Sequence, residues 1–79
     1  MRPERQYQTH VVKPPEEVNV RGLRAALRMT QQEFANRFGF SVNSIRNWEQ
    51  GRRNPEGPAR VLLKIIQREP EAAMRALAS

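Results

Sequence analysis

Cysteine is absent from this chain of 79 residues, and histidine occurs only once. Without thiols the chain can form neither disulfides nor cysteine-ligated metal sites, and its composition fits a reducing compartment. No apolar run approaches the roughly 18 residues that a membrane span needs, and the N-terminus lacks the apolar core of a signal peptide. We therefore expect a cytoplasmic protein without a metal, a cofactor or a membrane partner.

Groupings of catalytic residues are also lacking. The sequence offers no nucleophile–base pair, no carboxylate dyad and no glycine-rich phosphate loop, which argues against an enzyme. Its length leaves room for one small domain, whose core is only marginally stable alone. We therefore expect a second copy of the chain to add stability.

Two short helices joined by a tight turn are predicted between Thr30 and Gly51. Thr30 and Glu33 stand at the spacing of a capping box, in which the hydroxyl and the carboxylate each accept a hydrogen bond from a backbone amide. Gly39 tolerates the positive φ that ends this first helix. Ser41 is placed to cap the second helix, which is expected to end at Gly51.

The spacing of four residues favours a DNA-binding helix-turn-helix. A small side chain at Ala35 lets the second helix cross closely over the first, and Gly39 makes the turn. Ile45 and Trp48 then hold the second helix against the core, so that its opposite face projects. The alternative is an ordinary two-helix corner in an all-α domain.

Positive charge is concentrated around this turn. The chain carries a formal net charge of +6, and residues 20–60 contain eight arginines against three glutamates. Clustered arginine favours a polyanionic partner, because phosphates that are neutralised release counterions from the duplex. A solvated basic face that serves only solubility is the alternative. Together with the turn, the charge predicts binding to double-stranded DNA and association with the nucleoid.

An N-terminal arm is expected at residues 1–17, followed by the folded domain at residues 18–79. The arm is polar and has no apolar period, so we expect it to be extended or flexible. Its large apolar side chains are Tyr7, Val11 and Val12, and residues 6–12 could pair as a short strand.

The domain is expected to begin with a helix from residue 18 or 19 to Arg28. Asn19 is its expected cap, and the inward side chains are Val20, Leu23 and Leu27. A further helix is expected from Pro58, which suits the first helical position, to Glu69. Its apolar run makes it the expected core helix and comprises Val61, Leu62, Ile65 and Ile66.

Pro70 can start a last helix over residues 71–78, which completes an all-α architecture of five helices. Ala73, Met74 and Leu77 share one side of it. We expect this small apolar face to join two copies about a two-fold axis, so that the homodimer reads an inverted-repeat operator.

Residues 19–69 resemble the helix-turn-helix domains of the Xre/Cro/cI repressor family, which implies a lambda-repressor-like fold. Three segments are more narrowly similar to HigA-type antitoxins, which partner RelE-superfamily toxins: residues 44–53 (Ser-Ile-Arg-Asn-Trp-Glu-Gln-Gly-Arg-Arg), 55–59 (Pro-Glu-Gly-Pro-Ala) and 68–71 (Arg-Glu-Pro-Glu). The chain is also similar to the C-terminal DNA-binding domain of MqsA antitoxins, but it lacks the cysteine-rich zinc domain of that family.

The resemblance assigns base reading to the residues that follow the second cap, Val42, Asn43, Arg46 and Asn47. Their chemistry agrees, because asparagine can pair with adenine, arginine with guanine, and valine with a thymine methyl. Family repressors often have two glutamines at the first two of these positions, so the half-site read by this chain cannot be copied from a relative.

Contacts to DNA phosphates are implied at Gln31, Ser41, Arg52 and Arg53, where helix N-termini and the following loop meet the backbone. The alternatives are a surface helix former at Gln31 and plain solvation of the two arginines. Arg24 and Glu49 match a buried ion pair of the resembling repressors, and their role would be structural.

The resemblance implies a DNA-binding antitoxin that represses its own operon and neutralises a RelE-superfamily, HigB-like toxin. A phage-like or orphan transcriptional repressor without a toxin partner is the alternative, and a pure protein-interaction module is a third. The arm and the exposed faces of the first and fourth helices are open candidates for toxin contact.

Overall fold

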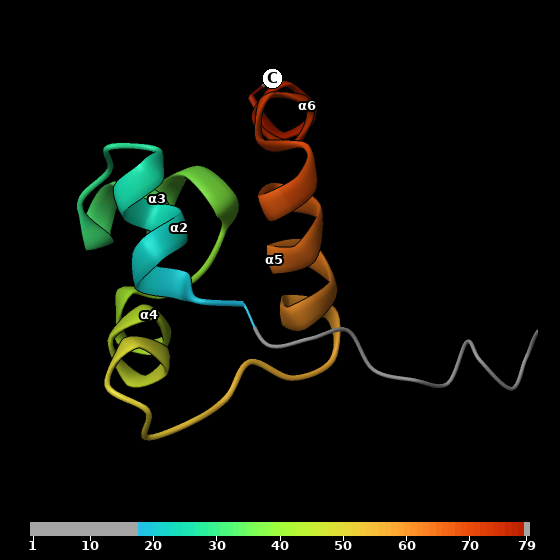
Figure 1. The fold of residues 1–79 in the computed structure, drawn as a ribbon. Coiled ribbons are helices and arrows are strands. Elements are labelled where there is room, and N and C mark those ends of the chain that lie inside the picture. The colour runs from blue at the N-terminus through green and yellow to red at the C-terminus, as the bar shows by residue number, and fades with distance from the viewer. Residues whose placement is uncertain (1–17, 79) are drawn as a thin grey trace, which may run out of the picture.

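The computed structural model describes residues 18–78. Five helices follow one another along the chain: α2 Val20–Ala26, α3 Gln31–Phe38, α4 Val42–Glu49, α5 Pro58–Arg68 and α6 Pro70–Leu77 (Figure 1). No strand occurs among the residues 18–78, so the prediction of an all-α, five-helix domain is confirmed. The expected arm, with its candidate strand at residues 6–12, lies outside the described residues.

Local hydrogen bonds cap the starts of α2 and α3 at the residues that the sequence predicted. The side chain of Asn19 accepts from the amide of Gly22 at 2.9 Å and caps α2. The Thr30 hydroxyl accepts from the Glu33 amide at 3.0 Å, and the Glu33 carboxylate accepts from the Thr30 amide at 2.8 Å, which completes the capping box of α3. Gly39 follows α3 with a φ of 79°.

Helix α2 is shorter than the sequence predicted, because it ends at Ala26 rather than at Arg28. Arg28 instead has a φ of 60°, in the left-handed region that costs an L residue roughly 1–2 kcal/mol. This bend brings the backbone carbonyl of Met29 to 3.1 Å from Nη1 of Arg24, which donates to it. The bend contains no glycine that would signal it in the sequence. The apolar spacing of Val20, Leu23 and Leu27 therefore predicted a helix that continues to Arg28.

The core forms around α3, and its members come from all five helices. They are Val20, Phe34, Ala35, Phe38, Ile45, Leu63, Ile66 and Ala73. The rings of Phe34 and Phe38 lie 4.9 Å apart between centroids, a distance at which aromatic pairs attract beyond their buried area. Ala35 is 1% exposed, as expected for the small residue where α4 crosses α3.

The expected faces of α5 and α6 were partly wrong. In α5 the side chains that face the core are Leu63 and Ile66, whereas Val61 and Ile65 are 53% and 47% exposed. In α6, Ala73 is buried and Met74 packs against the core, so neither belongs to an exposed apolar face.

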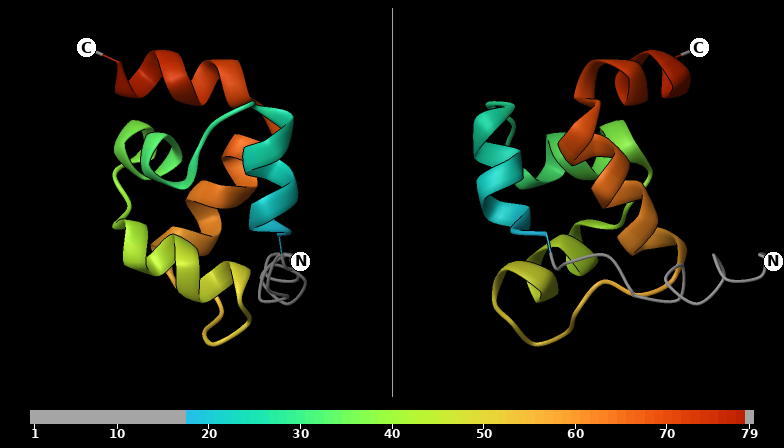
Figure 2. Two further views of the ribbon diagram at one scale, coloured as in Figure 1. Left: turned by 90° about the vertical axis from the view of Figure 1, so that its left-hand side faces the viewer. Right: turned by 45° about the vertical axis from the view of Figure 1, so that its right-hand side comes forward.

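Helices α4 and α6 lie at opposite ends of the domain, and α5 runs between these ends (Figures 1 and 2). Helices α2 and α3 lie on one side of α5. None of the helices within residues 18–78 is long and apolar enough to cross a membrane.

Candidate nucleic-acid interface

One face of helix α4 packs against the core, and the opposite face points out of the domain. Ser41 caps it by accepting from the amide of Ser44 at 3.0 Å. Ile45 is fully buried, and Trp48 packs edge-on against Phe40 with ring centroids 5.2 Å apart. The side of α4 opposite Ile45 and Trp48 is therefore presented at this end of the molecule.

The four predicted base-reading residues all lie on α4, within an arc of about 140° by helical periodicity. Asn43 and Arg46 are exposed, whereas Val42 and Asn47 are half-buried. Val42 also packs against the hydrophobic core. The centre of the outward face therefore carries an amide and a guanidinium, the groups that pair with adenine and guanine in the major groove.

The two arginines after α4 belong to a loop that is tied to the helix by its backbone. The amides of Arg52 and Arg53 both donate to the carbonyl of Asn47, at 2.9 and 3.4 Å. Gly51 allows this turn with a φ of 76°. Both arginine side chains are exposed, beside the face that carries the predicted base readers.

A hollow of about 450 Å³ lies between α4 and this loop. It is lined by Ser44, Trp48, Arg52, Arg53, Asn54 and Glu56. Sequence reasoning passed over Ser44 and Asn54, although Ser44 stands one turn before Trp48 on the flank of α4 that meets the loop. The hydroxyl of Ser41 donates to Oγ of Ser44 at 2.9 Å, so the phosphate donor expected at residue 41 is already engaged within the helix.

The carboxylate of Glu49 ties α4 to α2 and α3. Nε and Nη2 of Arg24 donate to its two oxygens at 2.7 and 3.0 Å, which makes a bidentate ion pair. Its side chain is 0% exposed, and that of Arg24 is 19% exposed. The hydrogen bond from Arg24 holds the pKa of Glu49 below its usual value, against burial, which acts to raise it. Nε of Arg21 approaches the same carboxylate at 3.4 Å from a side chain that is 67% exposed.

The structure places Gln31 beside this ion pair. Its Nε2 donates to Oε1 of Glu49 at 3.0 Å, an interaction that the sequence did not predict because the two residues are 18 positions apart. An amide nitrogen carries two hydrogens, so one remains for the phosphate contact predicted at this residue. The first helical residue of α3 is thus oriented by the last residue of α4.

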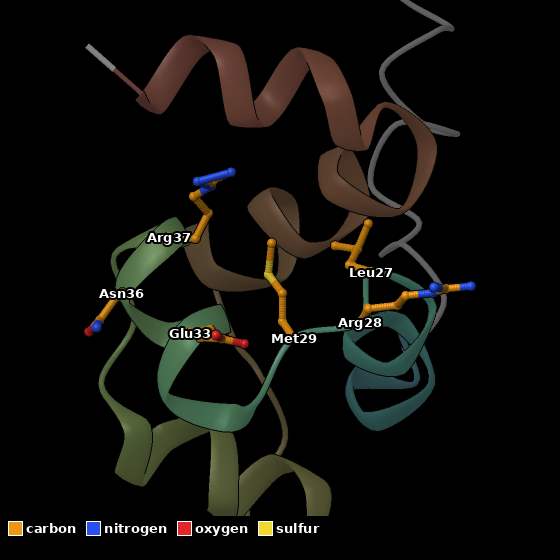
Figure 3. Close-up of a pocket in the computed structure, with 6 residues that line it drawn as sticks. All are labelled: Leu27, Arg28, Met29, Glu33, Asn36 and Arg37. Carbon is orange, nitrogen blue, oxygen red and sulfur yellow. The ribbon is translucent and has the colours of Figure 1, made fainter.

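A second pocket in the described part of the chain lies away from α4. It is an open hollow of about 580 Å³ lined by the loop after α2 and by α3, with Leu27, Arg28, Met29, Glu33, Asn36 and Arg37. Figure 3 shows Met29 and Arg37 pointing toward α6, on the side of α3 away from α4. The pocket is therefore separate from the outward face of α4.

Comparison with known proteins agrees with this geometry. The family model described as Helix-turn-helix (HTH_3) matches residues 20–67, which include both helices of the turn. A solved structure, a helix-turn-helix Xre-family-like protein from Agrobacterium tumefaciens, is 44% identical with a TM-score of 0.71 and is matched over 75% of this chain and 95% of its own.

Among curated proteins, Antitoxin HigA-2 of Vibrio cholerae is 38% identical to the chain, with 80% of this chain covered. The match spans 65% of that relative's length. The family match extends over more than half of the chain and coincides with the helices that present the outward face of α4. The chain therefore belongs to the Xre-type helix-turn-helix family of DNA-binding transcription regulators.

Proposed function

We propose that the chain is a sequence-specific DNA-binding antitoxin that represses its own operon as a homodimer on an inverted repeat. It acts on the bacterial nucleoid in the cytoplasm and neutralises a RelE-superfamily, HigB-like toxin. The observation that carries the DNA-binding part is the outward face of α4, whose exposed Asn43 and Arg46 stand next to the anchored arginine loop. The antitoxin part is supported by the relative named Antitoxin HigA-2.

Two kinds of contact are expected at this interface. Asn43 and Arg46, with Val42 and Asn47 beside them, read base edges in the major groove. Arg52 and Arg53 hold backbone phosphates, and the second N–H of Gln31 donates to another phosphate. The hydroxyl of Ser41 is already hydrogen-bonded to Ser44. Residue 41 is therefore expected to support phosphate binding only through its place at the N-terminus of α4, where backbone amides point outward.

The division into base readers and phosphate contacts is tested by comparing two alanine variants on two DNAs. One DNA is the duplex selected by the wild-type chain from a random pool, and the other is an unrelated duplex. Asn43→Ala should cost roughly 1–3 kcal/mol on the selected duplex and little on the unrelated one. Arg53→Ala should weaken binding to both and reduce the slope of log K against log salt by about 1. Equal losses for both variants on both DNAs would refute the division.

The antitoxin role is tested by looking for a toxin encoded by the neighbouring gene. A short gene that encodes a basic RelE-like protein should adjoin this one, and its product should co-purify with the chain and lose its toxicity in the complex. The alternative function is an orphan repressor. It is supported by the solved relative from Agrobacterium tumefaciens, which is named an Xre-family-like helix-turn-helix protein. Absence of such a gene, with sequence-specific DNA binding intact, would select this alternative.

A further inference from the structure

The open hollow beside the loop after α2 takes no part in the contacts to DNA proposed above. Its volume of about 580 Å³ lies within the range of roughly 300–1,000 Å³ that is usual for binding sites in proteins. We call it the Met29 hollow, and its lining consists of Leu27, Arg28, Met29, Glu33, Asn36 and Arg37.

The Met29 hollow combines an apolar floor with two cations. Leu27 and Met29 are half-buried and pack against the hydrophobic core. Figure 3 shows these two side chains between the guanidinium groups of Arg28 and Arg37. Both arginines are exposed, and within residues 18–78 no hydrogen bond or ion pair is found for either guanidinium. The hollow therefore suits an apolar group that has a negative charge on each side.

The two other polar residues of the lining leave this preference unchanged. Oδ1 of Asn36 accepts from Nε2 of Gln32 at 2.9 Å, so the amide nitrogen of Asn36 remains as a donor. The carboxylate of Glu33 is the only acidic group of the lining, and it accepts from the Thr30 amide at 2.8 Å. Two guanidinium groups and an amide donor thus stand against one carboxylate that is already engaged.

Contacts on the inner side of the loop hold the Met29 hollow in shape. Arg28 has a φ of 60°, and the carbonyl of the next residue, Met29, accepts from Nη1 of Arg24 at 3.1 Å. Arg24 is itself fixed by its bidentate pair with Glu49. None of these contacts uses a group that lines the opening of the hollow. A site that is already formed loses less free energy through ordering when it binds.

We propose that the Met29 hollow docks an acidic segment of a partner protein, in which apolar side chains lie between two carboxylates. The apolar side chains cover Leu27 and Met29, and the carboxylates pair with Arg28 and Arg37. This inference does not depend on the antitoxin role. A basic RelE-like toxin would be repelled by the two arginines, so the partner is a different protein.

The same features disfavour a nucleic acid at the Met29 hollow. A phosphate backbone matches the two arginines, but it has no apolar group to cover Leu27 and Met29. Glu33 also repels phosphate at the edge of the hollow. An acidic protein segment satisfies both the charge and the apolar floor.

The position of the Met29 hollow allows the partner and DNA to be bound together. The hollow lies on the side of α3 away from α4 (Figure 3). A segment docked there leaves the outward face of α4 uncovered. The contact is small beside the roughly 1,200–2,000 Å² of a stable interface, so binding should be weak and reversible.

Backbone-amide NMR signals of the isotope-labelled full chain test the site with a defined probe. The probe is the capped peptide Ser-Asp-Leu-Leu-Glu-Ser, titrated to a few millimolar. It should shift the signals of residues 27–29 and 33–37 and leave those of α4 in place, and added salt should weaken the effect. The peptides Ser-Asn-Leu-Leu-Gln-Ser and Ser-Asp-Ser-Ser-Glu-Ser, which lack the charges or the apolar side chains, should bind much more weakly. No localised shift with the probe, or equal binding of either control peptide, would overturn the inference.

Two pairs of substitutions separate the Met29 hollow from the general charge of the chain. Arg28→Asn/Arg37→Gln removes both cations, and asparagine tolerates the left-handed conformation at residue 28. This variant should bind the probe about tenfold more weakly and bind DNA like the wild type. Arg52→Gln/Arg53→Gln removes the same charge from the loop after α4 and should bind the probe like the wild type. Equal losses of probe binding in the two variants would overturn the inference.

The alternative occupant is tested with nucleic acid in place of the peptide. When the chain is saturated with the duplex that it selects from a random pool, the probe should still shift the signals of residues 27–29. Reversal of these shifts by the duplex would contradict simultaneous binding. Larger shifts of these signals with a single-stranded oligonucleotide than with the probe would overturn the inference in favour of a nucleic-acid site.

Discussion

Replacing Arg24 with alanine should destabilise the fold by about 3 kcal/mol at neutral pH. The change removes both bonds of the bidentate pair and leaves the Glu49 carboxylate at 0% side-chain exposure. Breaking a buried ion pair from one side typically costs roughly 3–5 kcal/mol. The lower end applies here because Gln31 and Arg21 still donate to the carboxylate. A domain of this size has a total stability of only about 3–9 kcal/mol, so the change should remove a third or more of it.

The destabilisation caused by Arg24→Ala should depend on pH, and the pKa of Glu49 determines the direction of this dependence. In the wild type, Arg24 lowers the pKa of Glu49. The pair therefore stabilises the fold fully above the ordinary pKa of a glutamate, and this contribution is lost as pH falls through the lowered folded value. Without Arg24, burial is left to raise the pKa of Glu49, and protonation removes the stranded charge. The stability difference between wild type and variant should therefore shrink between pH 7 and pH 4.

Urea unfolding followed by Trp48 fluorescence measures this difference, since Trp48 is the only tryptophan of the chain and packs against Phe40. Arg21→Ala is the matched control, because its guanidinium meets the same carboxylate from a side chain that is 67% exposed. An exposed pair of this kind is worth at most about 1 kcal/mol. If both variants lose the same stability at pH 7, or if the Arg24→Ala gap stays constant on acidification, the account of Glu49 is wrong.

Three further changes have defined outcomes. Gly39→Ala should destabilise the domain by roughly 1–2 kcal/mol in urea unfolding, because its φ of 79° disfavours any Cβ although the space around it is open; no loss would show that the turn relaxes. Thr30→Ala should cost about 1 kcal/mol by removing half of the capping box, and Thr30→Ser should restore most of it. Deletion of residues 1–17 should change DNA affinity by less than about 1 kcal/mol, because the charges of the segment nearly cancel; if the arm contacts a toxin, the same deletion should abolish neutralisation.

Helix ends were predictable from the sequence where the determining contact is local. The Thr30–Glu33 box, the turn at Gly39 and the proline starts of α5 and α6 each depend on residues within one helical turn of each other. The end of α2 was not predictable in the same way. It depends on Arg28 accepting a left-handed conformation while the carbonyl of Met29 binds Arg24.

The orientation of α5 could not be read from its sequence because apolar residues occupy most of its circumference. Leu63 and Ile66 on one side and Val61 and Ile65 on the other satisfy the helical period equally well. Only packing into the shared core decides which pair is buried. The bond between Gln31 and Glu49 was missed for a related reason, since it joins two helices whose relative position is a property of the whole fold.

The separate roles of the two faces of α4 affect how such a domain can be redirected to new DNA sequences. Ile45, Trp48 and Glu49 connect the helix to the rest of the protein, and among the residues 18–78 no hydrogen bond is found for the side chains of Asn43 and Arg46. The loop that carries Arg52 and Arg53 is fixed by a backbone carbonyl of residue 47, which any side chain there preserves. Positions 43 and 46 can therefore be varied together in a library at little cost to folding, and the same scaffold can be selected for new half-sites.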